Sequence, residues 1–255
     1  MPIQQMLLGA GSAVATKTYV DDVFSTNVWI GNDATRTISP GFDLSSSGDG
    51  GLVWIKSRSR SDDNVLGGSW LGDNKYLRSN HSGPRELNQT ARLKTVTSSG
   101  FQLGTSDVVN QSPHTYASWC FKNTDNFFKI VEWTGDGSSN RQINHGLGSV
   151  PGMIIVKTID ASYEWQVFHR SIGETKGLIL DKTNTSATKD WWNDTAPNAT
   201  NFTVGGSSTE TNDNGLSYVA YVFAGGASDS ATARSVDFDG SGDYLSLASS
   251  SDLAG

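Results

Sequence analysis

The side chains best suited to hold a ligand are two adjacent tryptophans, Trp191 and Trp192, in a polar stretch that also contains Asn193 and Asp194. An exposed indole ring can stack on a sugar, while neighbouring amide and carboxylate groups hydrogen-bond the sugar hydroxyls. These four residues are therefore a candidate glycan contact. The alternative, which we favour, is that one or both rings cover the edge of a β-sandwich.

Carboxylates are the next candidates for chemistry, because a glycosidase needs two of them about 5–9.5 Å apart across a cleft. The acidic residues considered are Asp62, Asp63, Glu164, Glu174, Asp190 and Asp194. They lie in polar stretches, where solvated carboxylates are ordinary. The sequence also has no phosphate-binding loop, no G-x-S-x-G elbow and no H-E-x-x-H motif. We therefore expect no catalytic activity and no cofactor.

Histidine and cysteine also give no metal or nucleophile pattern. The four histidines, His81, His114, His145 and His169, are scattered along the chain. Hydrogen bonds in turns are a better explanation for His145 and His169 than catalysis. A single cysteine, Cys120, excludes an internal disulfide or a cysteine-built metal site, and its place in an apolar strand indicates a core residue. Asp239 and Asp243 could hold calcium, but a plain β-turn is the preferred interpretation.

The elements that must position these residues come in two copies, because one pattern recurs about a hundred residues later in the chain. The matched pairs are residues 29–33 with 133–137, 51–56 with 152–157, 101–104 with 202–205, and 116–121 with 218–223. The matches are collinear, which indicates two homologous domains.

Short segments rich in Val, Ile, Trp, Tyr and Phe, bounded by Gly, Asn, Asp and Ser, predict strands in each copy. Residues 218–223 are apolar on both alternating faces, as in a strand buried on both sides. The prediction is an all-β chain of two tandem antiparallel β-sandwiches or partly open barrels, spanning residues 25–125 and 126–226.

Two further segments flank the repeats. Residues 1–24 contain Ile3, Met6, Leu7 and Leu8, which predict a short apolar docking segment. Residues 227–255 form a small-residue linker and the start of another strand-rich domain, so we expect the complete protein to be longer.

Net charge limits the partners, since 19 basic and 26 acidic residues give −7. Such a chain offers no broad cationic field for a nucleic acid or an anionic membrane. No apolar run reaches the ~20 residues of a membrane span, and no basic flank precedes the apolar residues of the N-terminus. Nucleic-acid binding, membrane insertion and a secretory signal are therefore not expected.

Several motifs resemble known bacteriophage domains. Residues 143–157 (INHGLGSVPGMIIVK), 167–171 (VFHRS), 192–197 (WNDTAP) and 202–205 (FTVG) resemble a domain of tail-fibre and other virion proteins, especially of marine tailed phages. The first repeat resembles the domain that usually precedes it. Residues 238–247 resemble the first strands of a laminin-G/concanavalin-like lectin domain, and residues 3–9 resemble the opening of phage structural proteins.

The resemblance implies a virion structural protein, most simply a tail fibre that attaches through its N-terminus and serves host adsorption distally. The expected partners are other tail or neck proteins and a host surface glycan. We also expect a homotrimer, because three docking segments can share a buried surface that one cannot form alone. The alternatives are a neck, collar or vertex decoration protein, or a carbohydrate-binding module without catalysis.

Overall fold

The computed structural model describes residues 19–205 and 209–226. The chain divides into two compact units, residues 1–225 and 226–255, and the described fold lies almost entirely in the first. The predicted docking residues Ile3, Met6, Leu7 and Leu8, and the turn at 239–243, lie outside the described residues.

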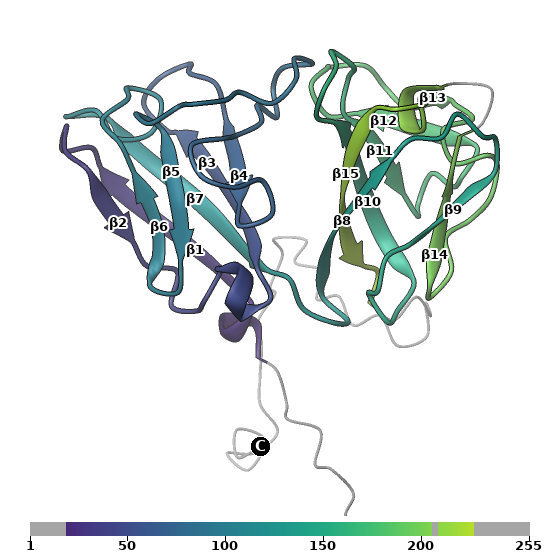
Figure 1. The fold of residues 1–255 in the computed structure, drawn as a ribbon, viewed down its shortest axis with the longest axis horizontal. Coiled ribbons are helices and arrows are strands. Elements are labelled where there is room, and N and C mark those ends of the chain that lie inside the picture. The colour runs from purple at the N-terminus through teal and green to yellow at the C-terminus, as the bar shows by residue number, and fades with distance from the viewer. Residues whose placement is uncertain (1–18, 206–208, 227–255) are drawn as a thin grey trace, which may run out of the picture. The chain divides into compact units, whose positions relative to one another are not determined.

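The first repeat is a sandwich of two antiparallel sheets (Figure 1). The larger sheet has the order β1 (Phe24–Ile30), β7 (Thr115–Lys122), β3 (Gly51–Ser57) and β4 (Val65–Gly68). The smaller sheet has the order β2 (Arg36–Ile38), β6 (Gly100–Leu103) and β5 (Leu93–Thr97).

The larger sheet of the second repeat has the same strand order as that of the first with two strands added at one edge, whereas its smaller sheet has two strands instead of three. Its larger sheet runs β8 (Phe128–Thr134), β15 (Ser217–Ala224), β10 (Pro151–Thr158), β11 (Gln166–His169), β12 (Lys176–Ile179) and β13 (Ala187–Thr188). Its smaller sheet pairs β9 (Arg141–Asn144) with β14 (Asn201–Val204). The predicted fold class is confirmed: two tandem antiparallel sandwiches, with no closed barrel among the described residues.

Helical structure among the described residues is limited to three short 3₁₀ turns. They are η1 (Val20–Asp22), η2 (Ser46–Gly48) and η3 (Thr209–Thr211). Gly, Ser, Thr and Asn in the connections favour turns over helices, which accounts for this architecture.

Each sandwich contains its own core, built around the same aromatic pair. Trp29 stacks on Tyr116 with ring centroids 5.7 Å apart, and Trp133 stacks on Tyr218 at 5.3 Å. The glycine two residues after each tryptophan is required for the same steric reason in both repeats. A Cβ at Gly31 or Gly135 would lie 2.2 or 1.9 Å from a backbone carbonyl oxygen, so only glycine fits.

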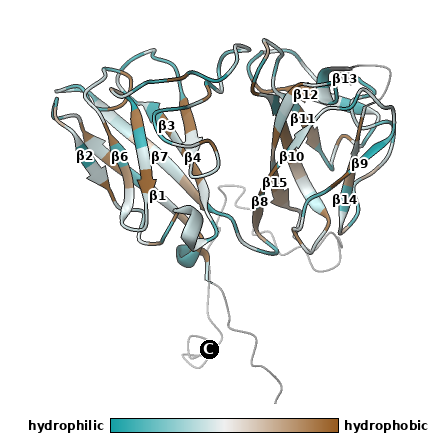
Figure 2. Ribbon diagram, viewed as in Figure 1, coloured by the Kyte–Doolittle hydropathy of each residue, from teal (hydrophilic) through white to brown (hydrophobic). Residues whose placement is uncertain are grey.

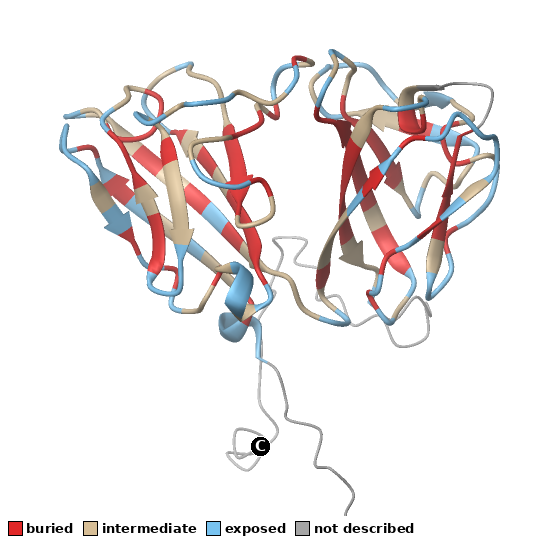
Figure 3. Cartoon of the chain, in the orientation of Figure 1, coloured by how far each residue is buried: buried red, intermediate tan, exposed pale blue. Residues whose placement is uncertain are grey.

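A third core joins the two repeats. On β15, Tyr218, Ala220 and Val222 face the interior of the second sandwich, while Val219 and Tyr221 face this third core. Figure 3 shows buried residues along β15 and β10, and Figure 2 shows that these strands are hydrophobic. The third core also contains Leu52 and Leu66 of the first repeat. A strand buried on both sides is what residues 218–223 predicted.

The connection between the repeats is tied down by hydrogen bonds. Asn123 donates from its backbone N–H to Gly50 O and from Nδ2 to Asp49 O, while its Oδ1 accepts the Ile130 N–H. Asn126 donates to Leu147 O in the second repeat. The connection is therefore anchored to both sandwiches.

Candidate functional site

The tryptophan pair predicted as a glycan contact is buried. Trp191 and Trp192 are 1% and 0% exposed and belong to the core of the second sandwich. Trp191 Nε1 donates to the Glu210 carboxylate, and Trp192 packs edge-on against Phe168. The rings point inward and offer no exposed stacking platform, in line with the alternative that the sequence favoured.

Asn193 and Asp194 do not form a platform with them either. Both residues have left-handed φ angles, 48° and 47°, and shape a turn whose polar side chains point away from the core. The polar neighbours therefore reflect the turn that follows the buried rings, and not a binding surface around them.

The histidines occupy turns, as the sequence indicates for two of them. Leu147 N–H donates to His145 Nδ1 at 3.1 Å, and Ser171 N–H donates to His169 Nδ1 at 3.2 Å. His81 accepts from Gly83 N–H in the same way at 2.8 Å. Burial lowers the pKa of His145, which stabilises the neutral ring that accepts this bond.

Cys120 and the acidic loop pair have structural partners. Cys120 is fully buried in the first core, and burial raises the pKa of its thiol to about 12. Asp62 pairs with Arg60 at 2.9 Å, and Asp63 pairs with Arg78 at 3.2 Å. These groups have the environments of a core thiol and of loop ion pairs.

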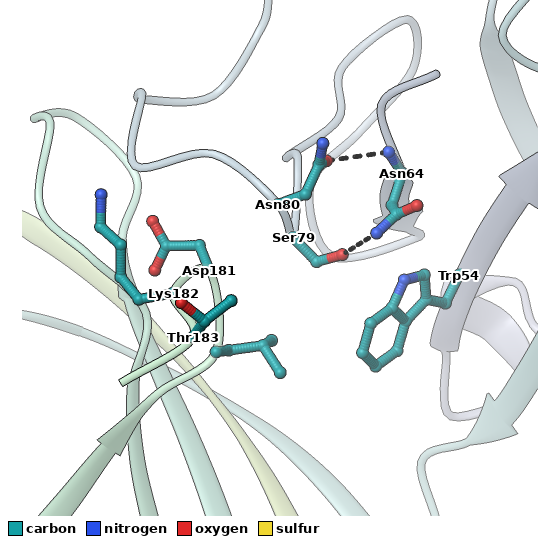
Figure 4. A pocket seen from close by; sticks show the side chains of 8 residues that line it. Trp54, Asn64, Ser79, Asn80, Asp181, Lys182 and Thr183 are labelled. Atoms are coloured by element: carbon teal, nitrogen blue, oxygen red, sulfur yellow. Dashed lines mark hydrogen bonds between the residues drawn. The ribbon is translucent and has the colours of Figure 1, made fainter. Parts of the chain in front are cut away.

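A pocket of about 300 Å³ lies where the two repeats meet (Figure 4). Trp54 of β3 forms one wall. Three polar side chains come from loops of the first repeat, and four residues come from the loop after β12 of the second. The lining residues are Trp54, Asn64, Ser79, Asn80, Leu180, Asp181, Lys182 and Thr183.

Hydrogen bonds fix the polar side chains of the first repeat in place. Asn64 Nδ2 donates to Ser79 Oγ at 3.0 Å, and the Asn64 backbone N–H donates to Asn80 Oδ1 at 2.9 Å, as Figure 4 shows. Asn80 Nδ2 donates to Asp63 Oδ1 at 3.1 Å. Burial acts to raise the pKa of Asp63, but the bonds from Asn80 and Arg78 outweigh it, so the pKa is lowered. An ionised Asp63 thus orients the Asn80 amide.

The opposite wall is held by residues that also join the repeats. Asp181 Oδ1 accepts the Trp165 backbone N–H at 3.0 Å. Trp165 Nε1 in turn donates to Arg78 O and His81 O of the first repeat, at 3.0 and 3.1 Å. The geometry of the pocket therefore depends on the packing between repeats.

Lys157 provides a second polar tie across this junction. It is fully buried, and its Nζ donates to Ser82 O at 2.9 Å and Tyr163 O at 2.7 Å. Burial lowers its pKa to about 8, against the opposing influence of Asp181 and Glu164. An ion pair between Arg85 and Asp160, at 3.2 Å, lies at the same junction.

The pocket offers an aromatic wall and a mixed set of hydrogen-bonding groups. No cluster of three or more His, Cys, Asp or Glu suited to a metal ion occurs within residues 19–205 and 209–226. Across the same residues, no helix is long and apolar enough to span a bilayer. The arrangement can bind a small polar ligand through one ring face and several hydrogen bonds.

Sequence reasoning did not find this pocket. Trp54 lies inside a run predicted as a central strand, and its equivalent in the second repeat is Ile155 of the third core. Asp181 and Lys182 lie in a stretch with no motif. A signal was available in the difference between Trp54 and Ile155, which marks a position where the two copies depart from each other.

The fold and the pocket define an all-β protein of two tandem sandwiches with a ligand-sized pocket at their junction. The chain belongs to the family described as Domain of unknown function (DUF7483), whose model matches residues 20–233 and so spans both repeats. No curated protein and no solved structure matches the chain.

Proposed function

We propose that this chain is a structural protein of a bacteriophage virion, belonging to a tail fibre or similar appendage and serving host adsorption. The motifs at 143–157, 192–197 and 202–205, which resemble a phage tail-fibre domain, are the sequence support. In this role the chain attaches to the particle through residues 1–24 and works without catalysis.

The junction between the repeats is the structural observation that carries the proposal. Eleven fully or nearly fully buried residues form the third core, and Lys157 and Trp165 add hydrogen bonds across it. The connecting residues Asn123 and Asn126 are bonded to both sandwiches. Two sandwiches packed together through a shared core resist bending at their junction. This property suits a segment that transmits mechanical load along an appendage.

Self-association is part of the proposal, with a homotrimer as the expected state. Val28 and Ile30 of the edge strand β1 are 69% and 62% exposed, and Trp119 of β7 is 37% exposed. These side chains share one sheet face, and Trp119 meets Trp54 edge-to-face at 6.4 Å. The apolar face thus continues outward from the third core, which favours another copy of the chain as its cover.

A second candidate function is a carbohydrate-binding module without catalysis. The observation that favours it is the pocket beside Trp54, with amide, hydroxyl and carboxylate groups around one indole ring. The two functions are compatible in an adsorption protein, but a free module would not be part of a particle.

Labelling purified particles tests the proposal. An antibody raised against residues 25–226 is expected to label tail appendages in negative-stain images. Label at the collar or capsid vertices instead supports a decoration protein and refutes the tail-fibre assignment. Particles that carry no label, although the antibody recognises the purified chain, refute the virion role altogether.

A further inference from the structure

The pocket at the junction presents an amide whose orientation the protein already fixes. Asn80 Oδ1 accepts the Asn64 backbone N–H at 2.9 Å, and Asn80 Nδ2 donates to Asp63 Oδ1 at 3.1 Å. The Asn80 side chain is nevertheless exposed, so it keeps a second N–H and a second lone pair for a ligand. Asn64 Oδ1, by contrast, is shielded from solvent and does not reach a ligand in the pocket.

The opposite wall presents a second acceptor. Asp181 uses Oδ1 to accept the Trp165 N–H, and its Oδ2 accepts no hydrogen bond within the part of the chain that the structure describes. Ligand hydroxyl groups can therefore be held from two sides, by Asn80 of the first repeat and Asp181 of the second. Lys182 and Thr183, on the same wall as Asp181, supply donors for ligand oxygens.

Trp54 gives the pocket an apolar face between these polar groups. Its ring is only partly buried, and Trp119 packs against it edge-to-face with centroids 6.4 Å apart, which restricts its orientation. A flat ring held in this way complements the C–H face of a sugar, whose hydroxyls then project toward the polar groups at its rim.

A neighbouring pocket extends the site. It measures about 440 Å³, shares Lys182 with the first pocket, and is also lined by Glu164, Asn184 and Lys189. Two adjoining pockets of this size, both within the ~300–1,000 Å³ range of small-molecule sites, can accommodate successive units of a chain-like ligand.

We propose that this site binds a neutral oligosaccharide, with a sugar ring on Trp54 and hydroxyl groups hydrogen-bonded to the Asn80 amide and the Asp181 carboxylate. This inference rests on the proposed adsorption function, because a saccharide is the class of ligand that host adsorption would need. The two pockets together carry two acidic side chains, Asp181 and Glu164, and two basic ones, Lys182 and Lys189, so the site has no excess of positive charge to hold an anionic polymer. The net charge of −7 on the chain also opposes an anionic polymer.

The test is binding of the purified full chain to immobilised neutral bacterial capsule and O-antigen polysaccharides, with alginate and polysialic acid as anionic comparators. At least one neutral polymer should bind with a Kd of about 0.01–1 mM. Trp54→Ala should weaken binding by at least about tenfold, since stacking and ring burial are lost. Asn80→Ala should weaken it by a similar factor, since an oriented hydrogen-bonding group is lost.

Leu87→Ala is the control, because it truncates an exposed apolar side chain of the first repeat that lines neither pocket. It should change the Kd by less than about threefold. If Trp54→Ala does not fold, Asp181→Asn replaces it. The amide oxygen can still accept the Trp165 N–H, while the stronger charged acceptor is removed, and a loss of about tenfold is expected.

Three results would overturn the inference: no binding to any neutral polymer, tighter binding to the anionic comparators, or binding that the pocket variants leave unchanged. Labelled particles together with a chain that binds no saccharide would leave the virion role in place and remove only the saccharide site. Saccharide binding by a chain absent from particles would do the reverse.

Discussion

Trp165 provides a direct test of whether the junction holds the two repeats together. Its ring is fully buried in the third core, stacked on Tyr221 with centroids 6.2 Å apart, and its Nε1 donates to two carbonyl oxygens of the first repeat. Arg78 O also accepts the His81 N–H, whereas the bond from Trp165 is the only one described for His81 O. Trp165→Phe therefore removes a cross-repeat bond as well as part of a buried ring.

The expected cost can be divided between these two losses. A net hydrogen bond contributes about 0.5–1.5 kcal/mol. The smaller ring leaves a cavity that costs about 1–2 kcal/mol, less than the ~3–5 kcal/mol of a full truncation to alanine. Trp165→Phe should thus lower the free energy of unfolding by about 2–3 kcal/mol in total.

Trp133→Phe is the matched control. Trp133 is also buried, at 8% exposure, but its Nε1 has no hydrogen-bond partner among the described residues. Its replacement removes the same atoms without breaking a hydrogen bond and also removes an unpaired buried N–H, so at most about 1–2 kcal/mol is expected. The difference between the two variants therefore contains the bond that crosses the junction and the relief of the unpaired Trp133 N–H.

Urea unfolding followed by far-ultraviolet circular dichroism gives both values, because this signal does not depend on the tryptophans alone. The wild-type chain should unfold in one transition, and Trp165→Phe should shift that transition to lower urea without splitting it. Equal costs for the two variants would refute the role assigned to the Trp165 bond. Two separate wild-type transitions would refute the joining of the repeats by the third core.

Three further predictions concern other sites. Because Lys157 has a folded-state pKa of about 8, against 10.5 for the free side chain, unfolding takes up a proton between these values. The stability of the wild type should therefore rise relative to Lys157→Met as pH increases from about 8 to 10, measured by urea unfolding. Trp192→Ala should cost about 3–5 kcal/mol in the same assay, and a mild effect would contradict its place in the core. Val28→Glu with Ile30→Thr should convert the homotrimer to a monomer in mass photometry and leave the melting temperature within a few degrees, since the second repeat carries Glu and Thr at these positions. A wild-type monomer, or a double variant that stays trimeric, would refute that interface.

The fold could be predicted from the sequence because its signals are local and are repeated. Residues 218–223 alternate two apolar rows, and the structure buries both. The sequence does not predict which residues cover the second apolar row. That cover is Leu52 and Leu66, which lie more than a hundred residues earlier in the chain and form no pattern with 218–223 until the sheets pack.

The candidate site was harder to predict, for a related reason. Trp191 and Trp192 have polar neighbours, so the sequence left open an exposed glycan contact beside the favoured alternative of rings that cover the sandwich. The backbone turns at Asn193 and Asp194, so the polar side chains face outward while the rings stay in the core. The pocket at the junction unites Trp54 and Asn64 with Asp181, and only the packing between repeats brings these distant positions together.

The duplication also accounts for why this pocket occurs at the junction. Lys56 and Lys157 are equivalent in the repeat, and each donates from Nζ to the carbonyl oxygen six residues later in its own repeat, Asp62 O at 3.0 Å and Tyr163 O at 2.7 Å. Lys157 Nζ also reaches Ser82 O of the other repeat, at 2.9 Å. The contact between repeats is thus heterologous, with a loop of the first copy held by strands of the second. A pocket built from the loops of one copy and the β12 loop of the other therefore forms only once in such a pair of repeats. Lys157→Met, which removes the hydrogen bonds of Lys157 across the junction, should weaken ligand binding even though this side chain does not line the pocket.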